Sequence, residues 1–448
     1  MAETSFSSYL QDRLGAYTDF DTPLVVHAIA SKPHACSALY DIPADPDSTA
    51  TSGGGGGGYR VTKRLLLVSQ SQGSVTPSAL RGPVMVAGLM AYEYRPPAKV
   101  AGVADQRPVL VYIEKVDSSG LWRRPSDRAS TASGSGDQSR SAALRSPLAA
   151  LLRVYVELCL AEYGRRRSVE FHVCARPQPE YLFAKSKANP AKRILNDQQL
   201  VRWWHRVLTT VAEKTAGAEV SRLSANWLVP GLSAAEARLL LGSSSQVPNS
   251  GTSATSTDAA TPGLAWTYGP SHSLTTRATE VIPRFPDDPK TRLLEKPGSR
   301  AWTVAEFYEW LAIGEECGAG HRVGFYILRY PRGVIATSTV PCTSASMGDA
   351  AERESGHWCT VSKAGWETVL SLLFHTSMDF SNDQGAQRSS ARFFQWMQRK
   401  FNLAGVSVRT PSAGSTSAPP DSPKVDDKDA RSVDLGEPAA KRVRLAGV

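Results

Sequence analysis

Val109-Leu110-Val111-Tyr112-Ile113-Glu114 decides the fold, because it is an extended apolar run rich in β-branched and aromatic residues. Runs of this kind form strands. Other such runs, most of them in the first third of the chain, cover residues 24–29, 64–68, 84–92, 169–175 and 323–329. Helical signals come mainly later. This order predicts one large α/β domain in which helices surround a mixed central sheet.

Helix ends are marked by cap residues and proline. Ser146-Pro147 opens a helix that is expected to run to Leu160 and to end before Gly164. Capping boxes, each with Glu or Gln three positions after the cap, open helices at Asn196, Ser233 and Thr303. Later helices are expected over residues 362–375 and 386–401. The tryptophans expected in the core are Trp302, Trp310, Trp366 and Trp396.

Low-complexity stretches interrupt the chain near residues 48–58, 123–145 and 243–262. They cannot bury much apolar surface, so we interpret them as flexible insertions in one domain, residues 1–406. Residues 407–448 have the same character and are expected to form a disordered tail. Within it, Lys441-Arg442-Val443-Arg444 resembles an import signal, which predicts a location in the nucleus.

Composition narrows the possible functions. The 448 residues carry a formal net charge of +9 at pH 7. No apolar run is long enough to span a membrane, and no secretory signal is visible. The cysteines and histidines are scattered without zinc-ligand spacing, so no metal is expected. The basic charge suits a CoA-type ligand, a nucleic acid or an acidic partner. No motif indicates specific nucleic-acid binding.

The stretch Val281-Ile282-Pro283-Arg284-Phe285-Pro286-Asp287-Asp288-Pro289-Lys290-Thr291-Arg292 gathers charges between prolines. Each proline fixes its own φ and pushes the preceding residue towards an extended conformation. We therefore expect a stiff, non-helical loop that holds the charges in set directions. Asp287 and Asp288 are neighbours, and like charges raise the pKa of one of the pair. Taken alone, an exposed turn is the alternative interpretation.

Ninety residues upstream, Tyr181-Leu182-Phe183 precedes a group of cations and a helix. The cations are Lys185, Lys187, Lys192 and Arg193. On the helix, Trp204 belongs to the apolar stripe at helical spacing, and Trp203 lies off it. A tryptophan off the stripe needs a partner elsewhere, although simple packing explains the pair equally well.

Together, the Tyr-Leu-Phe…Trp-Trp and Phe-Pro-Asp-Asp-Pro-Lys motifs resemble the fungal-specific histone H3 lysine acetyltransferases that work with histone chaperones. The resemblance covers most of the chain and includes residues 10–41, 112–120, 178–204, 284–294 and 315–326. This family is distantly related in structure to the CBP-type acetyltransferases. The resemblance implies an acetyl-CoA-dependent enzyme that acts on histone H3, with H4, in complex with acidic chaperones. Such an enzyme supports chromatin assembly, replication-coupled DNA repair and genome stability.

The resemblance also implies roles for single residues. Val116-Asp117-Ser118 forms a strand-end edge that contacts acetyl-CoA, and Arg193-Ile194-Leu195 contacts it from the facing loop. Asp288, beside Asp287, acts as the base or orients the incoming ammonium. Lys290 matches the position that family members autoacetylate.

The chemistry of acetyl-CoA suggests further binding residues. Its phosphates need cations, and the candidates nearest the motifs are Lys185, Lys187, Lys192, Arg193, Arg123 and Arg124. Tyr181, Trp203 and Trp204 are expected to wall the channel for the pantetheine arm, and the Trp204 face also suits the stem of a lysine.

Two other classes of function stay open. One is a noncatalytic nuclear scaffold that binds chaperones, although the paired aspartates, the double tryptophan and Lys290 favour an enzyme. The other is a nucleic-acid-binding nuclear protein, whose DNA affinity would depend steeply on salt. A +9 enzyme repels a basic histone, so acidic chaperones are expected as partners.

Overall fold

The computed structural model describes residues 14, 24–41, 58–71, 82–97, 99–100, 103–104, 106–122, 147–242, 263–314, 322–334, 358–403 and 406–408. All of them belong to one compact unit, Met1–Thr410. The insertions expected near 48–58, 123–145 and 243–262 lie outside these residues except for Gly58, as do Arg123, Arg124 and the basic cluster at 441–444. Within the described part, every helix is too short or too polar to cross a membrane.

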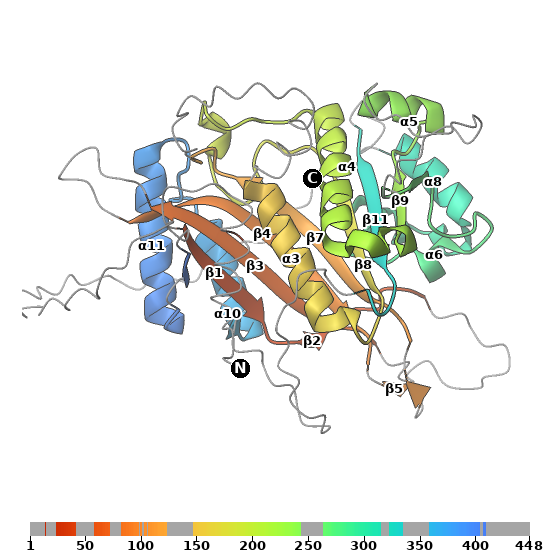
Figure 1. Ribbon diagram of the computed structural model, residues 1–448, viewed down its shortest axis with the longest axis horizontal. Helices are drawn as coiled ribbons and strands as arrows, with labels where there is room; N and C mark the ends of the chain where they lie inside the picture. Colours follow the sequence, from red (N-terminus) through yellow and green to blue (C-terminus); the bar gives the residue numbers. More distant parts are fainter. Residues whose placement is uncertain are drawn as a thin grey trace, which may run out of the picture. The chain divides into compact units, whose positions relative to one another are not determined.

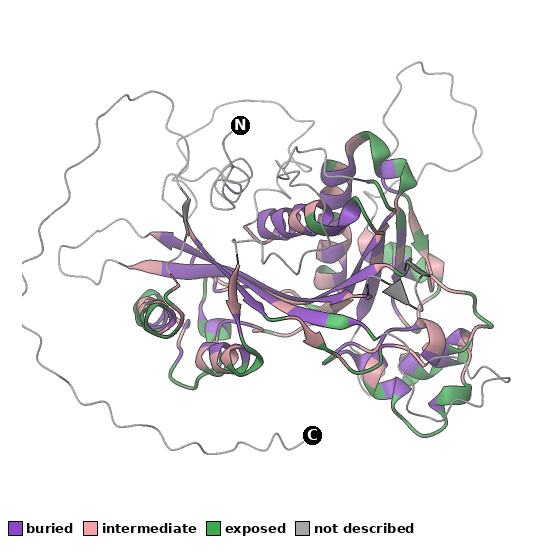
Figure 2. Ribbon diagram, turned by 90° about the horizontal axis from the view of Figure 1, so that it is seen from below, coloured by how far each residue is buried: buried purple, intermediate pink, exposed green. Residues whose placement is uncertain are grey.

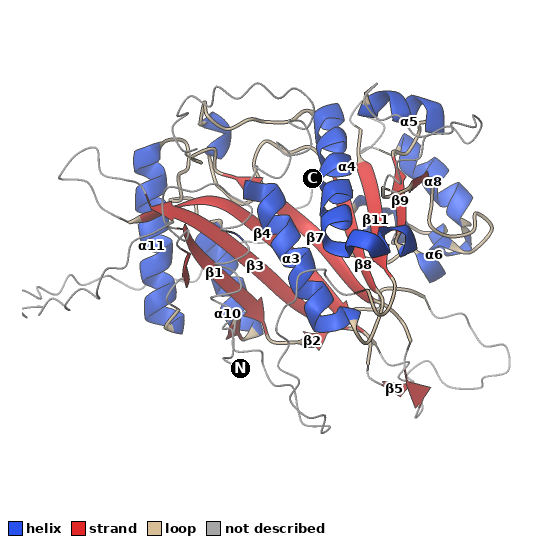
Figure 3. Cartoon of the chain, in the orientation of Figure 1, coloured by secondary structure: helices blue, strands red, loops and turns tan. Residues whose placement is uncertain are grey.

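A mixed sheet forms the centre of the unit (Figures 1 and 3). Its order is β10-β9-β11-β8-β7-β4-β3-β1-β12. These strands are β1 (Leu24–Ser31), β3 (Arg60–Ser71), β4 (Pro83–Arg95), β7 (Val109–Ser118), β8 (Val169–Ala175), β9 (Ser224–Leu228), β10 (Trp266–Tyr268), β11 (Gly324–Tyr330) and β12 (Cys359–Val361). The pairs β7–β8, β9–β10 and β1–β12 are parallel, and the other pairs along this path are antiparallel. The expected mixed sheet is confirmed.

Short strands complete the pairing. Strand β2 (His34–Ala35) pairs with β3, and β5 (Lys99–Val100) pairs with β6 (Val103–Ala104) in a separate small sheet. Strand β13 (Val406–Val408) pairs with β1, so regular structure extends two residues beyond the expected start of the tail.

Helices cover both faces of the sheet (Figure 2). Helices α3 (Pro147–Cys159) and α4 (Asp197–Ala216) lie on one face, and α10 (Lys363–Leu373) and α11 (Asp383–Phe401) lie on the other. Helices α6 (Ala278–Val281), α7 (Pro289–Leu294) and α8 (Val304–Ile313) pack together against Phe325 of β11. Helix α5 (Ala234–Leu241) contacts α4. A π-helical turn, Leu160–Gly164, extends α3, and 3₁₀ turns cover Ser186–Ala188, Gly217–Arg222 and Ser299–Ala301.

The cap signals were reliable. All three capping boxes are formed, at Asn196, Ser233 and Thr303. Helix α11 begins three residues earlier than expected, because Asn382 accepts a hydrogen bond from the backbone N–H of Gly385 and caps it. Its predicted end at Phe401 is confirmed.

One of the four expected core tryptophans was placed wrongly. Trp366 is fully buried, and Trp302 and Trp396 are partly buried against the core. Trp310, however, is 49% exposed. Its ring stacks on Trp302 with the ring centroids 5.7 Å apart, so it covers a neighbour instead of entering the core.

The expectation of a non-helical loop over residues 281–292 was wrong at both ends. Val281 ends α6, and Pro289 begins α7. Asp288 is the N-cap of α7, and its carboxylate accepts the Lys290 N–H at 2.9 Å. A proline is well tolerated at the first helical position, where its missing N–H would have had no partner. The segment between the two helices is non-helical, with a turn at residues 286–287.

Candidate active site

A cleft of about 420 Å³ opens where β7 ends, between α3, α4 and the loop that follows β8. The lining residues come from four parts of the chain: Glu114, Val116, Asp117, Ser118, Gly120 and Trp122; Pro147 and Leu148; Cys174, Gln178, Pro179 and Tyr181; and Ala191, Lys192, Arg193, Ile194, Leu195, Leu200, Trp203 and Trp204. Most of the expected cofactor residues line the cleft, but the exposed Lys185 and Lys187 do not. Arg123 and Arg124 lie outside the described residues.

Asp117 organises this cleft. Its Oδ2 accepts the backbone N–H groups of Tyr181 and Leu182, both at 2.9 Å, and more distantly that of Phe183. Its Oδ1 accepts the N–H of Ser118 and the ammonium of Lys192, both at 2.8 Å. A buried carboxylate with this many donors is well satisfied. Asp117 thus ties the end of β7 to both segments of the loop after β8.

Lys192 lines the cleft and is already paired within the protein. Its ammonium lies between Asp117 and the Ser186 hydroxyl, 2.8 Å from each, and its side chain is almost fully buried. A charge that is already paired in this way contributes little to binding a phosphate. Arg193 is exposed on the same loop, and it remains a candidate for a phosphate contact.

The two loops at the cleft approach each other closely. Gly120 has φ +84°, and a Cβ there would lie 2.7 Å from the backbone of Lys192. Nearby, the Asn189 side chain donates to the carbonyl of Ser119 at 2.9 Å and accepts the N–H of Ala191 at 3.0 Å. The wall at residues 119–121 is therefore fixed against the wall at residues 189–192.

Aromatic side chains form the opposite wall. Trp204 is buried, as its place on the apolar stripe predicts. Trp203 lies beside it edge to face, with the ring centroids 4.9 Å apart, and is only partly buried. Both line the cleft together with Tyr181, so the position of Trp203 off the stripe is explained by its contact with the cavity.

A smaller hollow of about 20 Å³ adjoins the cleft. It shares Glu114, Cys174, Gln178 and Tyr181 with the cleft, and it is completed by Tyr112, Lys115, Arg176 and Asp287. Asp287 has φ +54°, and its half-exposed carboxylate lies 3.6 Å from Arg176. Of the two aspartates, Asp287 is therefore the one that reaches a cavity lining in the described part of the protein.

Asp288 does not line the hollow and is completely buried. Its Oδ2 is 3.1 Å from the ammonium of Lys290, which is also buried and lies 4.5 Å from the centre of the Phe325 ring. Burial alone would lower the pKa of Lys290, but the attraction of the Asp288 carboxylate outweighs it and raises this pKa. Lys290 is therefore held as an ammonium paired with Asp288.

The similarity to known proteins agrees with this geometry. Residues 101–396, more than half of the chain, match the histone acetyltransferase KAT11-type domain. The chain belongs to this family. The matched range contains β7, α4 and α7, and so it includes every described residue of the cleft and the hollow.

Three fungal proteins named histone acetyltransferase rtt109 are similar in sequence to this KAT11-type chain. The Aspergillus flavus protein is 30% identical over 201 residues, 38% of this chain and 35% of the relative. The Schizosaccharomyces pombe protein is 31% identical over 176 residues, which are 36% of this chain and 41% of the relative. The Candida albicans protein is 29% identical over 156 residues, which are 34% of this chain and 36% of the relative. The alignments thus span about two fifths or less of these relatives.

The fold is also similar to that of a solved KAT11-type structure. The crystal structure of Rtt109 from Aspergillus fumigatus superposes with a TM-score of 0.62. It covers 90% of this chain and 100% of that structure, at 20% sequence identity. This identity supports a shared fold and nothing finer.

Sequence reasoning missed several residues of this KAT11-type cleft. Trp122 and Leu148 line it from the end of β7 and from α3, and Glu114 and Cys174 line both cavities. Alternate residues of a regular strand share a face, but the register shift between Ile113 and Lys115 interrupts this alternation at Glu114. The sequence therefore carried no direct signal that Glu114 lines the cleft beside Val116. No signal marks Leu148 either, which reaches the cleft only through the packing of α3.

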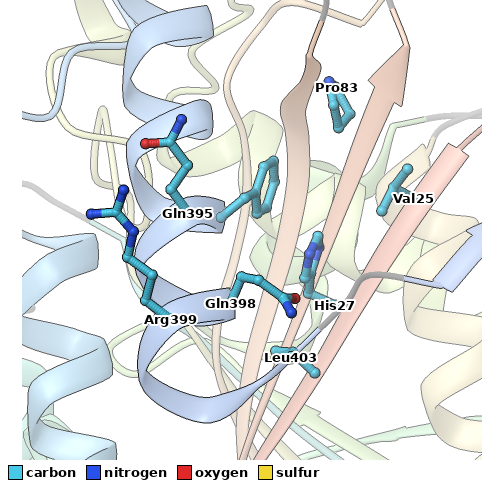
Figure 4. Close-up of a pocket in the computed structure, with 8 residues that line it drawn as sticks. Val25, His27, Pro83, Gln395, Gln398, Arg399 and Leu403 are labelled. Atoms are coloured by element: carbon cyan, nitrogen blue, oxygen red, sulfur yellow. The ribbon is translucent and has the colours of Figure 1, made fainter. Parts of the chain in front are cut away.

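A second cavity, of about 400 Å³, lies between β1 and α11 (Figure 4). Its lining is mostly apolar, and His27 stacks on Phe394 with the ring centroids 4.3 Å apart. Figure 4 shows Val25 and His27 on the strand side, and Gln395, Gln398 and Arg399 on the helix. It is built from elements remote in sequence from the paired aspartates and the double tryptophan. Among the described residues no cluster of metal ligands occurs.

Proposed function

We propose that this protein is an acetyl-CoA-dependent lysine acetyltransferase that acts on histone H3, with H4, presented by acidic histone chaperones. In the nucleus it would support chromatin assembly, replication-coupled DNA repair and genome stability. The observation that carries the proposal is the cleft at the end of β7, which meets a hollow with acidic side chains next to the Asp288–Lys290 pair.

The cleft fits the pantetheine arm of acetyl-CoA. Val116, Leu195 and Trp203 supply apolar walls. Residues 116–118 lie beyond the last pair of β7 with β8, so this edge of the strand offers backbone groups for the amides of the arm. Pockets of this kind, mostly apolar with a few polar groups, are typical of small-molecule sites. Arg193 is exposed near Ile194, where it is available to a phosphate.

The substrate lysine reaches the thioester from the hollow. Tyr181 and Trp204 flank its aliphatic stem, and Asp287 attracts its ammonium at the rim. The ammonium first gives one proton to a carboxylate of the hollow and becomes a neutral amine. The amine attacks the thioester carbonyl, the new C–N bond forms as the C–S bond breaks, and CoA leaves as a thiolate that takes the second proton from the nitrogen. The fixed walls of the cleft contribute by holding the two reactants in register.

Asp288 acts on this reaction through Lys290. Of the two roles considered from the sequence, its burial favours orientation, because both of its oxygens already contact Lys290. We retain Lys290 as the autoacetylated residue. Acetylation would remove its charge and leave Asp288 as a buried carboxylate without a counter-ion, which is costly. The modification would therefore change the conformation or protonation of this corner.

The experiment is incubation of the full chain with acetyl-CoA and an H3–H4–chaperone complex, followed by peptide mass spectrometry. The expected result is acetylated H3 lysine, together with acetyl-Lys290 in the enzyme. Asp288→Asn, checked for folding by circular dichroism, is expected to lose most of this activity while still binding acetyl-CoA. If the wild-type chain binds the chaperone but does not bind acetyl-CoA and forms no acetylated product, the protein is a scaffold.

A further inference from the structure

Glu114 occupies an irregular position in β7. Met90 of β4 pairs with Lys115, and the next residue, Ala91, pairs with Ile113, so the register shifts and Glu114 has no direct partner on β4. On the other side, the pairing of β7 with β8 ends at Ile113. Bulges of this kind are common beside active sites, where they redirect a side chain. Glu114 is therefore released from both ladders where the cleft and the hollow meet.

The Glu114 carboxylate is buried but not fully satisfied. Only 7% of its side-chain area is exposed, although it lines both cavities. Its Oε1 is paired with the ammonium of Lys115. The Tyr92 hydroxyl interacts with the carboxylate, but no described residue donates a well-formed hydrogen bond to Oε2. A buried carboxylate oxygen without a donor is unfavourable, and such an oxygen at a cavity wall is suited to receive a donor from a ligand.

The groups around Glu114 define which ligand fits. Lys115 and Tyr112 lie on the same strand as Glu114, and Tyr92 lies on β4. Strand β8 and the loop after it contribute Cys174, Arg176 and Tyr181, and the segment before α7 contributes Asp287. Arg176 lies 3.6 Å from Asp287, and Lys115 is paired with Glu114 Oε1. The cations of the hollow thus already have carboxylate partners, and Oε2 remains as the acceptor for an added cation.

We propose that Glu114 Oε2 binds the ammonium group of the substrate lysine and takes its first proton when acetyl transfer begins. The inference rests on the proposed function and identifies how the same site recognises its acceptor. The lysine ammonium gives one proton to Oε2 and becomes a neutral amine. The amine then forms the C–N bond as the C–S bond breaks, its second proton passes to the CoA thiolate, and Glu114 returns its proton to solvent after product release.

The two aspartates fit this role less well. Both oxygens of Asp288 contact Lys290, and Asp288 lines neither cavity in the described part of the protein. Asp287 is half exposed and lies between Arg176 and Arg292. A charge so exposed is screened by solvent, whereas a buried oxygen at the junction of the cavities interacts more strongly.

Binding tests the recognition step without requiring turnover. The first peptide is an H3 peptide with an acetylated N-terminus and one unmodified lysine. In the second peptide norleucine, which has no ammonium, replaces this lysine. Binding of both is measured in the presence of saturating CoA. The wild-type protein is expected to bind the lysine peptide at least tenfold more tightly, and Glu114→Gln should remove most of this preference. Glu219→Gln, in an exposed ion pair with Arg222, is the matched control for loss of one carboxylate.

Activity tests the proton transfer. At pH 7.5, Glu114→Gln is expected to lower kcat/KM for the lysine peptide by about tenfold to a hundredfold. The deficit should shrink at pH 9.5, where more of the substrate amine is neutral because lysine has a pKa of about 10.4. Affinity for acetyl-CoA should stay within twofold of the wild-type value.

Lys115→Met separates this role from simple ion pairing, because it breaks the same pair from the other side. If Lys115→Met reproduces the Glu114→Gln defect, the ion pair is structural and the proposal is wrong. Equal preference for lysine over norleucine in Glu114→Gln and wild type would also overturn it, as would a deficit of the same size at both pH values. If the wild type binds the lysine peptide selectively but transfers no acetyl group, the binding result still decides the role of Glu114, and only the proposed function fails.

Discussion

Single residues hold the two walls of the cleft at a fixed distance. Asp117 accepts hydrogen bonds from Tyr181, Leu182 and Lys192, and Gly120 allows its strand end to touch the Lys192 backbone. Substitution of either residue would remove its contact. The contacts of Asp117 need a carboxylate with several acceptor sites, and the contact of Gly120 needs the absence of a Cβ.

Gly120→Ala is expected to weaken acetyl-CoA binding by tenfold or more, because the new Cβ would lie 2.7 Å from the Lys192 backbone at a positive φ. Gly333→Ala is the matched control, since Gly333 has a similar φ of +89° but open space around it. The control should cost only the backbone strain, about 1 kcal/mol, and leave binding unchanged. Calorimetric titration and thermal unfolding of both variants measure the two effects; similar binding by both would mean that the cleft tolerates the displacement.

The Asp288–Lys290 pair is expected to show strong coupling. Lys290→Gln removes the charge as acetylation does, leaves the buried Asp288 carboxylate without a counter-ion, and should lower stability by about 3 kcal/mol. Asp288→Asn with Lys290→Gln removes both charges and should recover much of that loss. Urea unfolding of the two single variants and the double variant measures the coupling. Additive losses would show that the two side chains do not depend on each other.

The structure also explains which residue roles the sequence could not reveal. Lys192 was expected at a phosphate because it follows a run of cations, but its partner Asp117 lies far from it in sequence. Such a pairing depends on the fold and leaves no local pattern. The two adjacent aspartates were visible in the sequence, but their different positions were not. The positive φ of Asp287 places its carboxylate at the hollow, and the capping role of Asp288 keeps its carboxylate in the core.

At the level of helices and strands, local signals predicted the long elements well. The capping boxes and the extended apolar runs all correspond to real elements. The short strands β9, β10 and β12 were missed, because three to five residues carry too little periodicity to be recognised. Helix α7 was missed for another reason: the prolines were taken to exclude a helix, whereas Pro289 occupies the one helical position that favours it.

The packing of β1 on α11 is expected to make the fold sensitive to acid. His27 is buried against Phe394, and burial lowers its pKa to about 4, below the ordinary value of 6.5. Between these values the unfolded chain binds a proton that the folded chain does not, so stability is full above pH 6.5 and falls as the pH drops towards 4. The loss from this group at pH 5 is about 2 kcal/mol.

His27→Phe keeps a ring against Phe394 but does not titrate. The difference in unfolding free energy between pH 7.5 and pH 5 should therefore be about 2 kcal/mol smaller in this variant, as measured by urea denaturation at both pH values. His375→Asn, at an exposed position, is the control and should behave like the wild type. An unchanged pH dependence in His27→Phe would show that His27 is not buried in its neutral form.

For the whole molecule, net charge governs how the protein would meet its proposed substrate. The formal charge of +9 is spread over a chain whose proposed substrate is itself strongly basic. Long-range repulsion lowers the rate of encounter between like-charged proteins, and salt screens it. The local charges of the hollow include Glu114 and Asp287 and attract one lysine, but they act only over short distances.

We therefore expect much faster acetylation of H3 when an acidic chaperone covers the histone charge. With free H3–H4, the initial rate should rise between 20 and 150 mM salt, because screening weakens the repulsion. With the chaperone complex, the rate should be about tenfold or more higher at low salt and should fall as salt weakens docking of the basic enzyme. A short neutral H3 peptide is the control and should show little dependence on either condition. Equal rates with and without chaperone across the salt series would show that charge does not govern the encounter.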